Sequence, residues 1–383
     1  MKHSLSENKK LKEIVSGLSA SMLTGTYAIC ICGILGFDLW HVLFCTVICF
    51  MLSFEAKTKL FSPDAFLLLP ILYMVSSDAK KLLPVVAIVG TAIAVILSKV
   101  LKNKPIPSFA FAGGGIGIAL VVTILLTNNY FGIGAFGATA LDMLKTYRSL
   151  GFHPDFRGLL YGTVTLFAMI TYPFKFKKLN KYLPAEFMTL LIPLVMNLFL
   201  NPVKELTTIN EIDSFNALSF SDLAYDFTLN SISASDITVA IKASVVSGVL
   251  IYLYSAKTNE KENLHFLANA STTFVSGLPV RAFSIQSFTC VSLITAIIST
   301  VAVLVLFPDI LSRIPMHCVG ALLIVSAWQH VPYKKVAAAF KENTVLALIM
   351  IIASVVIFVT TELFTATIFC MLCALVSGRY SRK

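Results

Sequence analysis

Long apolar stretches recur along almost the whole chain, separated by short polar or charged connections. Stretches of about 20 apolar residues are long enough to cross the hydrocarbon core of a bilayer as α-helices. The pattern therefore predicts an all-α polytopic membrane protein with about fourteen spans. The predicted spans are residues 12–35, 38–55, 63–77, 81–101, 108–127, 157–174, 184–201, 235–256, 262–276, 281–292, 293–307, 315–331, 343–359 and 362–378.

Two polar stretches organise this series. Residues 130–150 are interrupted by charged side chains such as Asp142, and we expect an amphipathic helix or loop there, at the outer surface. The loop at 202–233 divides the spans into two halves. Because each half has an odd number of passes, the halves must enter the membrane in opposite orientations, which predicts a 7+7 inverted repeat. The expected parts are a tail at 1–11, a first repeat at 12–201, an extracytoplasmic loop at 202–233, a second repeat at 234–378 and a tail at 379–383.

The net charge of +10 follows this topology. Only 13% of the residues are charged and 57% are hydrophobic, whereas soluble domains carry about 25% charged residues. Positive charge concentrates in cytoplasmic connections of membrane proteins, so both termini are expected in the cytoplasm, at the cytoplasmic membrane, and a nucleic-acid partner is not indicated. Positive residues cluster at Lys9, Lys10, Lys12, Lys57, Lys59, Lys102, Lys104, Lys175, Lys177, Lys178, Lys181, Lys257, Lys261, Lys334, Lys335, Arg379, Arg382 and Lys383.

The third segment of each half is interrupted in a similar way. The first reads Ser62-Pro63-Asp64-Ala65-Phe66 and the second Leu278-Pro279-Val280-Arg281-Ala282-Phe283. Proline is favoured in the first helical turn, so we expect half-helices to begin here, at segments 3 and 10, although each proline could instead kink a continuous helix. Two helix N-termini facing each other would offer free N–H groups to an anion, as in inverted-repeat transporters.

Four ionisable residues within predicted spans are candidates for function. Asp64 and Arg281 occupy matching positions of the two broken segments, and we expect them to form an ion pair or to share the substrate. Lys242 could extend toward the membrane surface or face the substrate path. Glu186 follows a proline and is interpreted as an N-terminal helix cap.

Other motifs favour a transporter over an enzyme. Gly113, Gly114, Gly115 and Gly117 in the fifth span predict close helix packing. The chain contains no phosphate-binding glycine loop and no Gly-x-Ser-x-Gly elbow. No carboxylates are paired at a catalytic spacing. An enzyme, a metal site and a cofactor are therefore not indicated.

With these residues in place, the chain resembles the SulP (sulfate permease) family of anion transporters. The resemblance is strongest in Leu267-Ala268-Asn269 running to Pro279, in Ile314-Pro315 through Trp328, and in Thr361-Glu362-Leu363. It is looser at Gly17-Leu18, Ser62-Pro63 and Ile106-Pro107 through Gly117. The family's membrane domain has a 7+7 inverted repeat, with core and gate domains, shared with uracil and xanthine permeases. The resemblance implies that fold here.

In that family the substrate anion lies between the starts of the third and tenth segments, flanked by the first and eighth. The resemblance implies a binding site formed by Thr26, Tyr27, Ser62, Asp64, Ala65, Arg281, Ala282, Ser284, Ile285 and Gln286.

The chain also departs from the family pattern. Thr26-Tyr27 replaces the family's Pro-Gln pair in the first segment. Ile251 lies near the position where the family has an acidic residue in the eighth segment, which is linked to cation coupling in some members. Gln286 aligns with an arginine, and Asp64 replaces a neutral residue. The chain ends at Lys383, so we expect the membrane domain without the cytoplasmic STAS domain.

The sequence therefore predicts a secondary transporter of a small inorganic or organic anion, of the sulfate, bicarbonate or carboxylate class. We expect an elevator-like alternating-access mechanism, with the anion, the lipid bilayer and a second copy of the chain (a homodimer) as partners. One alternative is a nucleobase-permease-like carrier whose neutral substrate hydrogen-bonds Asp64. The other is a non-transporting membrane partner protein in which Asp64 and Arg281 lock each other.

Overall fold

The computed structural model describes residues 2–37, 39–75, 82–101, 108–134, 137, 139–199, 233–255, 262–285, 287–311 and 313–380. The predicted loop at 202–233 lies outside these residues except for Ser233, and so does Gln286. Five helices in this part of the chain, α1, α2, α4, α5 and α9, are long and apolar enough to cross a membrane. Shorter apolar helices accompany them, which fits the predicted polytopic membrane protein.

In the described part of the chain, the first half consists of long helices, shorter helices and one strand. Its elements are α1 (Lys2–Leu35), α2 (Leu39–Ala56), β1 (Lys59–Pro63), α3 (Ala65–Met74), α4 (Leu83–Leu101), α5 (Ser108–Phe131), α6 (Ala140–Leu150), α7 (Phe156–Lys175), η2 (Leu179–Lys181) and α8 (Ala185–Phe199). The stretch predicted to be amphipathic forms α6, whose N-terminus is capped by Thr139.

The second half repeats this order, except that α11 follows β2 with no counterpart of α3 between them in the described residues. Its elements are α9 (Ala234–Ser255), α10 (Glu262–Ser271), η7 (Thr272–Phe274), β2 (Val280–Ser284), α11 (Cys290–Leu306), α12 (Pro308–Leu311), α13 (Met316–Gln329), α14 (Tyr333–Glu342), α15 (Thr344–Thr360) and α16 (Leu363–Tyr380). A short helix again separates the fifth and sixth long elements, since α14 takes the place that α6 has in the first half.

The packing of the helices shows the inverted repeat directly. Helix α4 packs against α9, and its counterpart α11 packs against α1. Likewise α5 packs against α15, and α13 packs against α7. Helix α8 contacts α1, as α16 contacts α9. Exchanging the two halves maps each contact onto another, which is what two similar units related by a twofold axis require.

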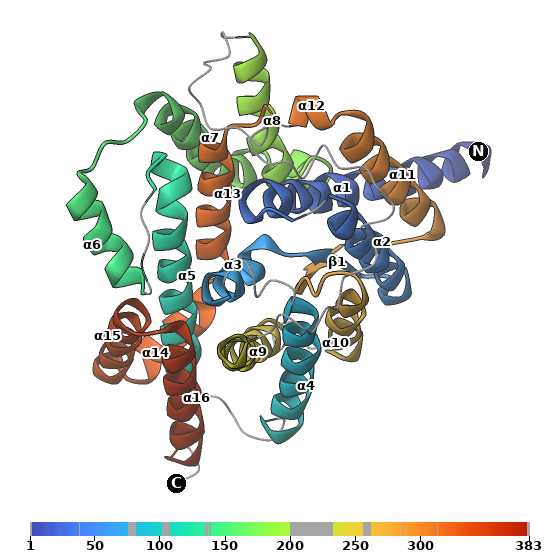
Figure 1. The fold of residues 1–383 in the computed structure, drawn as a ribbon. Helices are drawn as coiled ribbons and strands as arrows, with labels where there is room; N and C mark the ends of the chain where they lie inside the picture. The colour runs from blue at the N-terminus through green and yellow to red at the C-terminus, as the bar shows by residue number, and fades with distance from the viewer. Residues whose placement is uncertain are drawn as a thin grey trace.

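The helices form two groups (Figure 1). Helices α1–α4 and α9–α11 make one group, the core, and α5–α8 with α13–α16 make the other, the gate. In Figure 1 the gate helices α5, α13 and α15 lie on the left, while α2, α4, α10 and α11 of the core lie on the right. Helix α3 and the two strands lie near the centre, between the groups.

Glycines of α5 bring the gate helices into close contact, as the sequence predicted. A Cβ at Gly117 would lie 2.3 Å from Cδ2 of Phe358, and one at Gly113 would lie 2.4 Å from Oγ of Ser354. Both partners belong to α15. Real Cβ atoms do not approach other atoms so closely, so these positions of α5 accept only glycine without a shift of α15.

One predicted helix is replaced by extended backbone. Residues 281–292 were expected to form the half-helix of segment 10, but β2 occupies residues 280–284 and α11 begins only at Cys290. Within a membrane every backbone N–H and C=O needs a partner, and pairing with β1 supplies these partners to β2. Residues 285–289 then remain before α11, and they are too few for a further half-helix. In the first half, α3 occupies the corresponding place between β1 and α4.

Candidate functional site

The two broken segments meet in a short antiparallel ribbon at the centre of the molecule. Strand β1 pairs with β2 over their whole lengths, with Ser62 opposite Arg281 and Pro63 opposite Val280. The expectation that the broken segments at 62–66 and 281–286 lie together is confirmed for the described residues, which leave out Gln286. The ribbon replaces the predicted pair of facing helix N-termini by one helix N-terminus and one strand.

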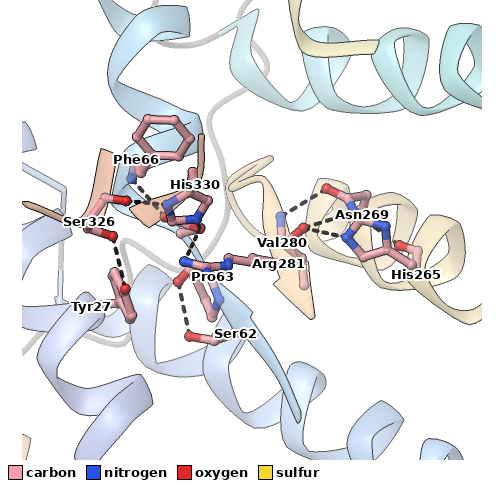
Figure 2. A network of polar contacts seen from close by, with 11 residues as sticks. Tyr27, Ser62, Pro63, Phe66, His265, Asn269, Val280, Arg281, Ser326 and His330 are labelled. Atoms are coloured by element: carbon pink, nitrogen blue, oxygen red, sulfur yellow. Dashed lines mark hydrogen bonds and ion pairs between the residues drawn. The ribbon is translucent and has the colours of Figure 1, made fainter. Parts of the chain in front are cut away.

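Polar side chains from neighbouring helices hold the free edges of the ribbon (Figure 2). Asn269 on α10 accepts a hydrogen bond from the N–H of Val280 at 2.9 Å and donates one to its carbonyl at 3.3 Å. His265 on the same helix also contacts this carbonyl, at 2.8 Å. Ser53 on α2 accepts a bond from the N–H of Phe61 at 2.8 Å. Asn269 thus makes the backbone hydrogen bonds that a neighbouring strand would make, and it fixes the position of β2.

Helix α3 begins inside the protein, directly after the ribbon. Its cap is Asp64, whose Oδ1 accepts a hydrogen bond from the N–H of Phe66 at 2.8 Å. The N–H of Asp64 itself bonds the carbonyl of Pro279 at 2.9 Å. With ten residues α3 is about 15 Å long, roughly half the thickness of the hydrocarbon core. The N-terminus of α3 is buried, and its first-turn donors face the carboxylate of its own cap.

The second oxygen of Asp64 lies between two basic side chains. Oδ2 is 3.7 Å from Nη1 of Arg281 and 3.9 Å from Nε2 of His330, at the C-terminal end of α13. The side chain of Asp64 is fully buried, and that of Arg281 is 23% exposed. His330 also stacks on the ring of Phe66, with centroids 4.4 Å apart, and its Nδ1 contacts the carbonyl of Ser326. In Figure 2 the imidazole lies between Phe66 and the ribbon.

Two aromatic rings lie next to Arg281. The guanidinium lies over the ring of Phe283, 4.3 Å from its centroid, and that ring is 5.7 Å from the ring of Tyr27 on α1. The Tyr27 hydroxyl and the Ser326 hydroxyl share a hydrogen bond of 3.2 Å. Since Ser326 belongs to α13, this bond joins the core to the gate.

A cavity of about 830 Å³ lies between the core and the gate on this side. Phe283 lines it, so the guanidinium of Arg281 lies directly behind the cavity wall. Glu186, in the first turn of α8, also lines it and is within electrostatic reach of Arg281. The lining also includes two lysines, Lys12 and Lys181.

The structure brings five of the ten predicted binding residues together at the ribbon. The ribbon itself contains Ser62 and Arg281. Beside it lie Tyr27, Asp64 and Ala65, and all five residues except Arg281 are fully or almost fully buried. The Ser62 hydroxyl donates to the carbonyl of Pro63 at 3.0 Å.

The remaining predicted residues lie further out. Thr26 is buried and donates to the Met22 carbonyl one turn earlier. Ala282 is partly buried on β2, while Ser284 and Ile285 line the cavity.

Gln286 lies outside the described residues. Lys242, predicted either to reach outward or to face the substrate path, makes a 2.9 Å ion pair with Glu362 at the start of α16. Both side chains are substantially exposed, at 36% and 57%.

From the sequence, His330 was not predicted to be a site residue, and no structural role was predicted for Asn269. His330 lies at the end of a span, where it reads as an interfacial residue, and its contact with Asp64 joins positions far apart in the chain. Asn269 was noted only as part of a family motif. A buried amide in an otherwise apolar segment needs hydrogen-bond partners, and this requirement was the available signal.

Known structures resemble the chain, whereas no protein-family profile and no curated protein sequence matches it. The transmembrane domain of a cyanobacterium bicarbonate transporter, BicA, aligns with a TM-score of 0.64 and 13% identity over 96% of each chain. SLC26A9 aligns with a TM-score of 0.69 and 11% identity, covering 96% of this chain and 65% of that one. The murine Solute Carrier 26 family member A9 anion transporter, in its inward-facing state, aligns with a TM-score of 0.66 and 10% identity over 97% and 68%.

The chain has the fold of the SLC26 membrane domain. This confirms the expected fold, with its two inverted halves, and it agrees with the helix packing described above. The chain spans about two thirds of the SLC26A9 chains, 65% and 68%, and nearly all of the BicA domain, 96%. In the described residues, α11 follows β2 with no half-helix between them, whereas a half-helix was expected at segment 10.

Proposed function

We propose that the chain is a secondary transporter of a small anion of the bicarbonate, sulfate or carboxylate class. One observation carries this proposal. Arg281 is held by β2 beside the N-terminus of a half-helix, directly behind the wall of a cavity between two groups of helices. A partly buried guanidinium and a helix N-terminus both favour a negative charge.

The same arrangement suggests how the anion would cross. The core carries the ribbon, and the gate supplies Glu186 and Lys181 on the opposite wall of the cavity. Sliding the core against the gate would move Arg281 and its anion from one side of the membrane to the other, as in an elevator. A relative of this fold is named a bicarbonate transporter, and another an anion transporter in its inward-facing state, which supports this reading.

We further infer the setting in which this transport takes place. The cavity is lined by Lys12 and Lys181, from segments that the positive-inside rule assigns to the cytoplasm. We therefore propose that both termini lie in the cytoplasm and that the described conformation is inward-open. The bilayer of the cytoplasmic membrane and a second copy of the chain are the proposed partners, and no catalytic activity is assigned.

Uptake into proteoliposomes tests the proposal. We expect uptake of at least one of labelled sulfate, bicarbonate or a dicarboxylate, and Arg281→Ala should reduce it about tenfold or more, equivalent to a loss of about 1.4 kcal/mol in binding. Lys334→Ala is the matched control, because Lys334 is exposed on α14. Equal effects of the two substitutions would remove the site from the ribbon. Uptake of uracil alone would favour a carrier of neutral substrates, and uptake of none of them by folded protein would favour a non-transporting partner.

A further inference from the structure

The anion position at the N-terminus of α3 is already filled by a carboxylate. Oδ1 of Asp64 takes the N–H of Phe66, and Oδ2 faces Arg281 at 3.7 Å. Among the described residues, no group donates a hydrogen bond to Oδ2, although the side chain is fully buried. A transported anion would need these same two partners, the helix N-terminus and the guanidinium. Asp64 and the substrate therefore compete for one place.

Charge balance makes this competition severe. With Asp64 ionised, the pair of Asp64 and Arg281 is neutral. Adding a monovalent anion would leave a net charge of −1 at a buried position, where an uncompensated charge costs several kcal/mol. Adding the anion together with one proton on Asp64 keeps the site neutral.

We propose that Asp64 is a tethered competitor of the transported anion, so that one proton binds with each anion. The inference rests on the proposed function and specifies its coupling. On the loading side, the Asp64 carboxylate takes a proton from water and releases Arg281, and the anion then takes the released place. On the other side the anion leaves, Asp64 gives its proton to water, and the ion pair forms again.

The surroundings of Asp64 leave few other acceptors for this proton. The charged or titratable side chains described near Asp64 are Arg281 of β2, His330 at the end of α13, and Tyr27 and Cys30 of α1. Glu186 of α8 lies near Arg281. Helices α5 and α9 also pack against α3.

The ionisable side chains described on these two helices are Tyr130 on α5 and Asp236, Lys242 and Tyr252 on α9. Lys242 is committed to Glu362, and Tyr130 shares a hydrogen bond with Thr163. His330 is therefore the main rival proton acceptor.

Asp64→Asn is the decisive variant, because asparagine caps a helix as well as aspartate does and cannot be ionised. Uptake of labelled sulfate and of chloride is measured in proteoliposomes between pH 5.5 and 8, with a pH-sensitive dye inside to count protons. For the unaltered protein we expect uptake of chloride, the monovalent anion to which the charge balance applies, to rise about tenfold per unit fall in pH at limiting concentration, with one proton entering per chloride. Asp64→Asn should abolish both the pH dependence and the proton entry, and at pH 8 its uptake should exceed that of the unaltered protein about 300-fold, since the tenfold slope extends over the 2.5 units from pH 5.5.

Three controls separate the explanations. Asp64→Glu should keep the pH dependence, and Asp142→Asn, the same change on the exposed helix α6, should leave both readouts unchanged. Thermal unfolding of each variant in detergent confirms that it is folded.

Other results would overturn the inference. Anion uptake without protons or pH dependence would do so while leaving the proposed function intact, and so would a folded Asp64→Asn variant that is inactive at every pH. A pH dependence lost in His330→Gln but kept in Asp64→Asn would assign the proton to His330 instead. Uptake of neither anion by folded protein would contradict the proposed function itself.

Discussion

At the scale of single residues, the site depends on how a buried charge is balanced. Asp64 is fully buried and Arg281 is only 23% exposed, so each is the main compensation for the other. Removing one partner of such a pair is more harmful than removing both, because the remaining charge stays buried. The separation of 3.7 Å shows an ion pair that is not tightly hydrogen-bonded, which fits the proposal that this contact opens when an anion binds.

A double-mutant cycle measures this dependence. Arg281→Ala alone should lower the free energy of unfolding by about 3 kcal/mol, because it leaves the Asp64 carboxylate uncompensated. Combining it with Asp64→Asn should restore part of that loss, with a coupling energy of about 1–3 kcal/mol. Denaturant unfolding of the four proteins in one detergent gives the values. Additive effects would show that the two side chains do not interact.

At the scale of elements, glycines decide how closely helices approach within the gate. The ring of Phe358 on α15 fills the space that a side chain at Gly117 would need. We expect Gly117→Ala to destabilise the protein by about 1–3 kcal/mol, since the ring must move out of its packed position. Gly25→Ala on α1 is the matched control, because no atom lies within 4 Å of its added Cβ. Alanine there should be neutral or stabilising by about 1 kcal/mol, through helix propensity alone. Thermal unfolding compares the two, and equal stabilities would contradict close packing at Gly117.

Much of the element order could be predicted from sequence, because spans of lipid-exposed helices are defined by length and apolarity. The segment at 281–292 shows the limit. A short apolar run has the same composition in a strand and in a half-helix, so Val280–Ser284 gave no local sign of its extended form. The choice depends on β1, which lies far away in the chain and supplies the missing backbone partners. The site shows the same limit: Asp64 and Arg281 were found by their matching positions, whereas His330 becomes visible only when α13 is packed against α3.

At the scale of the whole molecule, the proposed movement depends on the division into core and gate. Contacts within each group are extensive, whereas those between the groups are fewer and include single polar contacts. One of these joins the Tyr27 hydroxyl to Ser326 at 3.2 Å, and another joins the Ser19 hydroxyl to the Lys181 carbonyl at 3.4 Å. Both would have to break if the core slides past the gate.

A disulfide placed across this boundary tests the movement. Ser19→Cys with Lys181→Cys, in a background with the exposed Cys290 replaced by serine, places one thiol on α1 of the core and the other on η2 of the gate. Oxidation should stop anion uptake, and reduction should restore it, because the bond fixes the two groups in one arrangement. Ser16→Cys with Ser287→Cys is the matched control, since Ser16 donates to the Ser287 carbonyl at 3.0 Å and both residues belong to the core. That disulfide should leave uptake unchanged, because the core would move as one body. Equal uptake with either disulfide formed would show that transport needs no displacement of the core against the gate at Lys181.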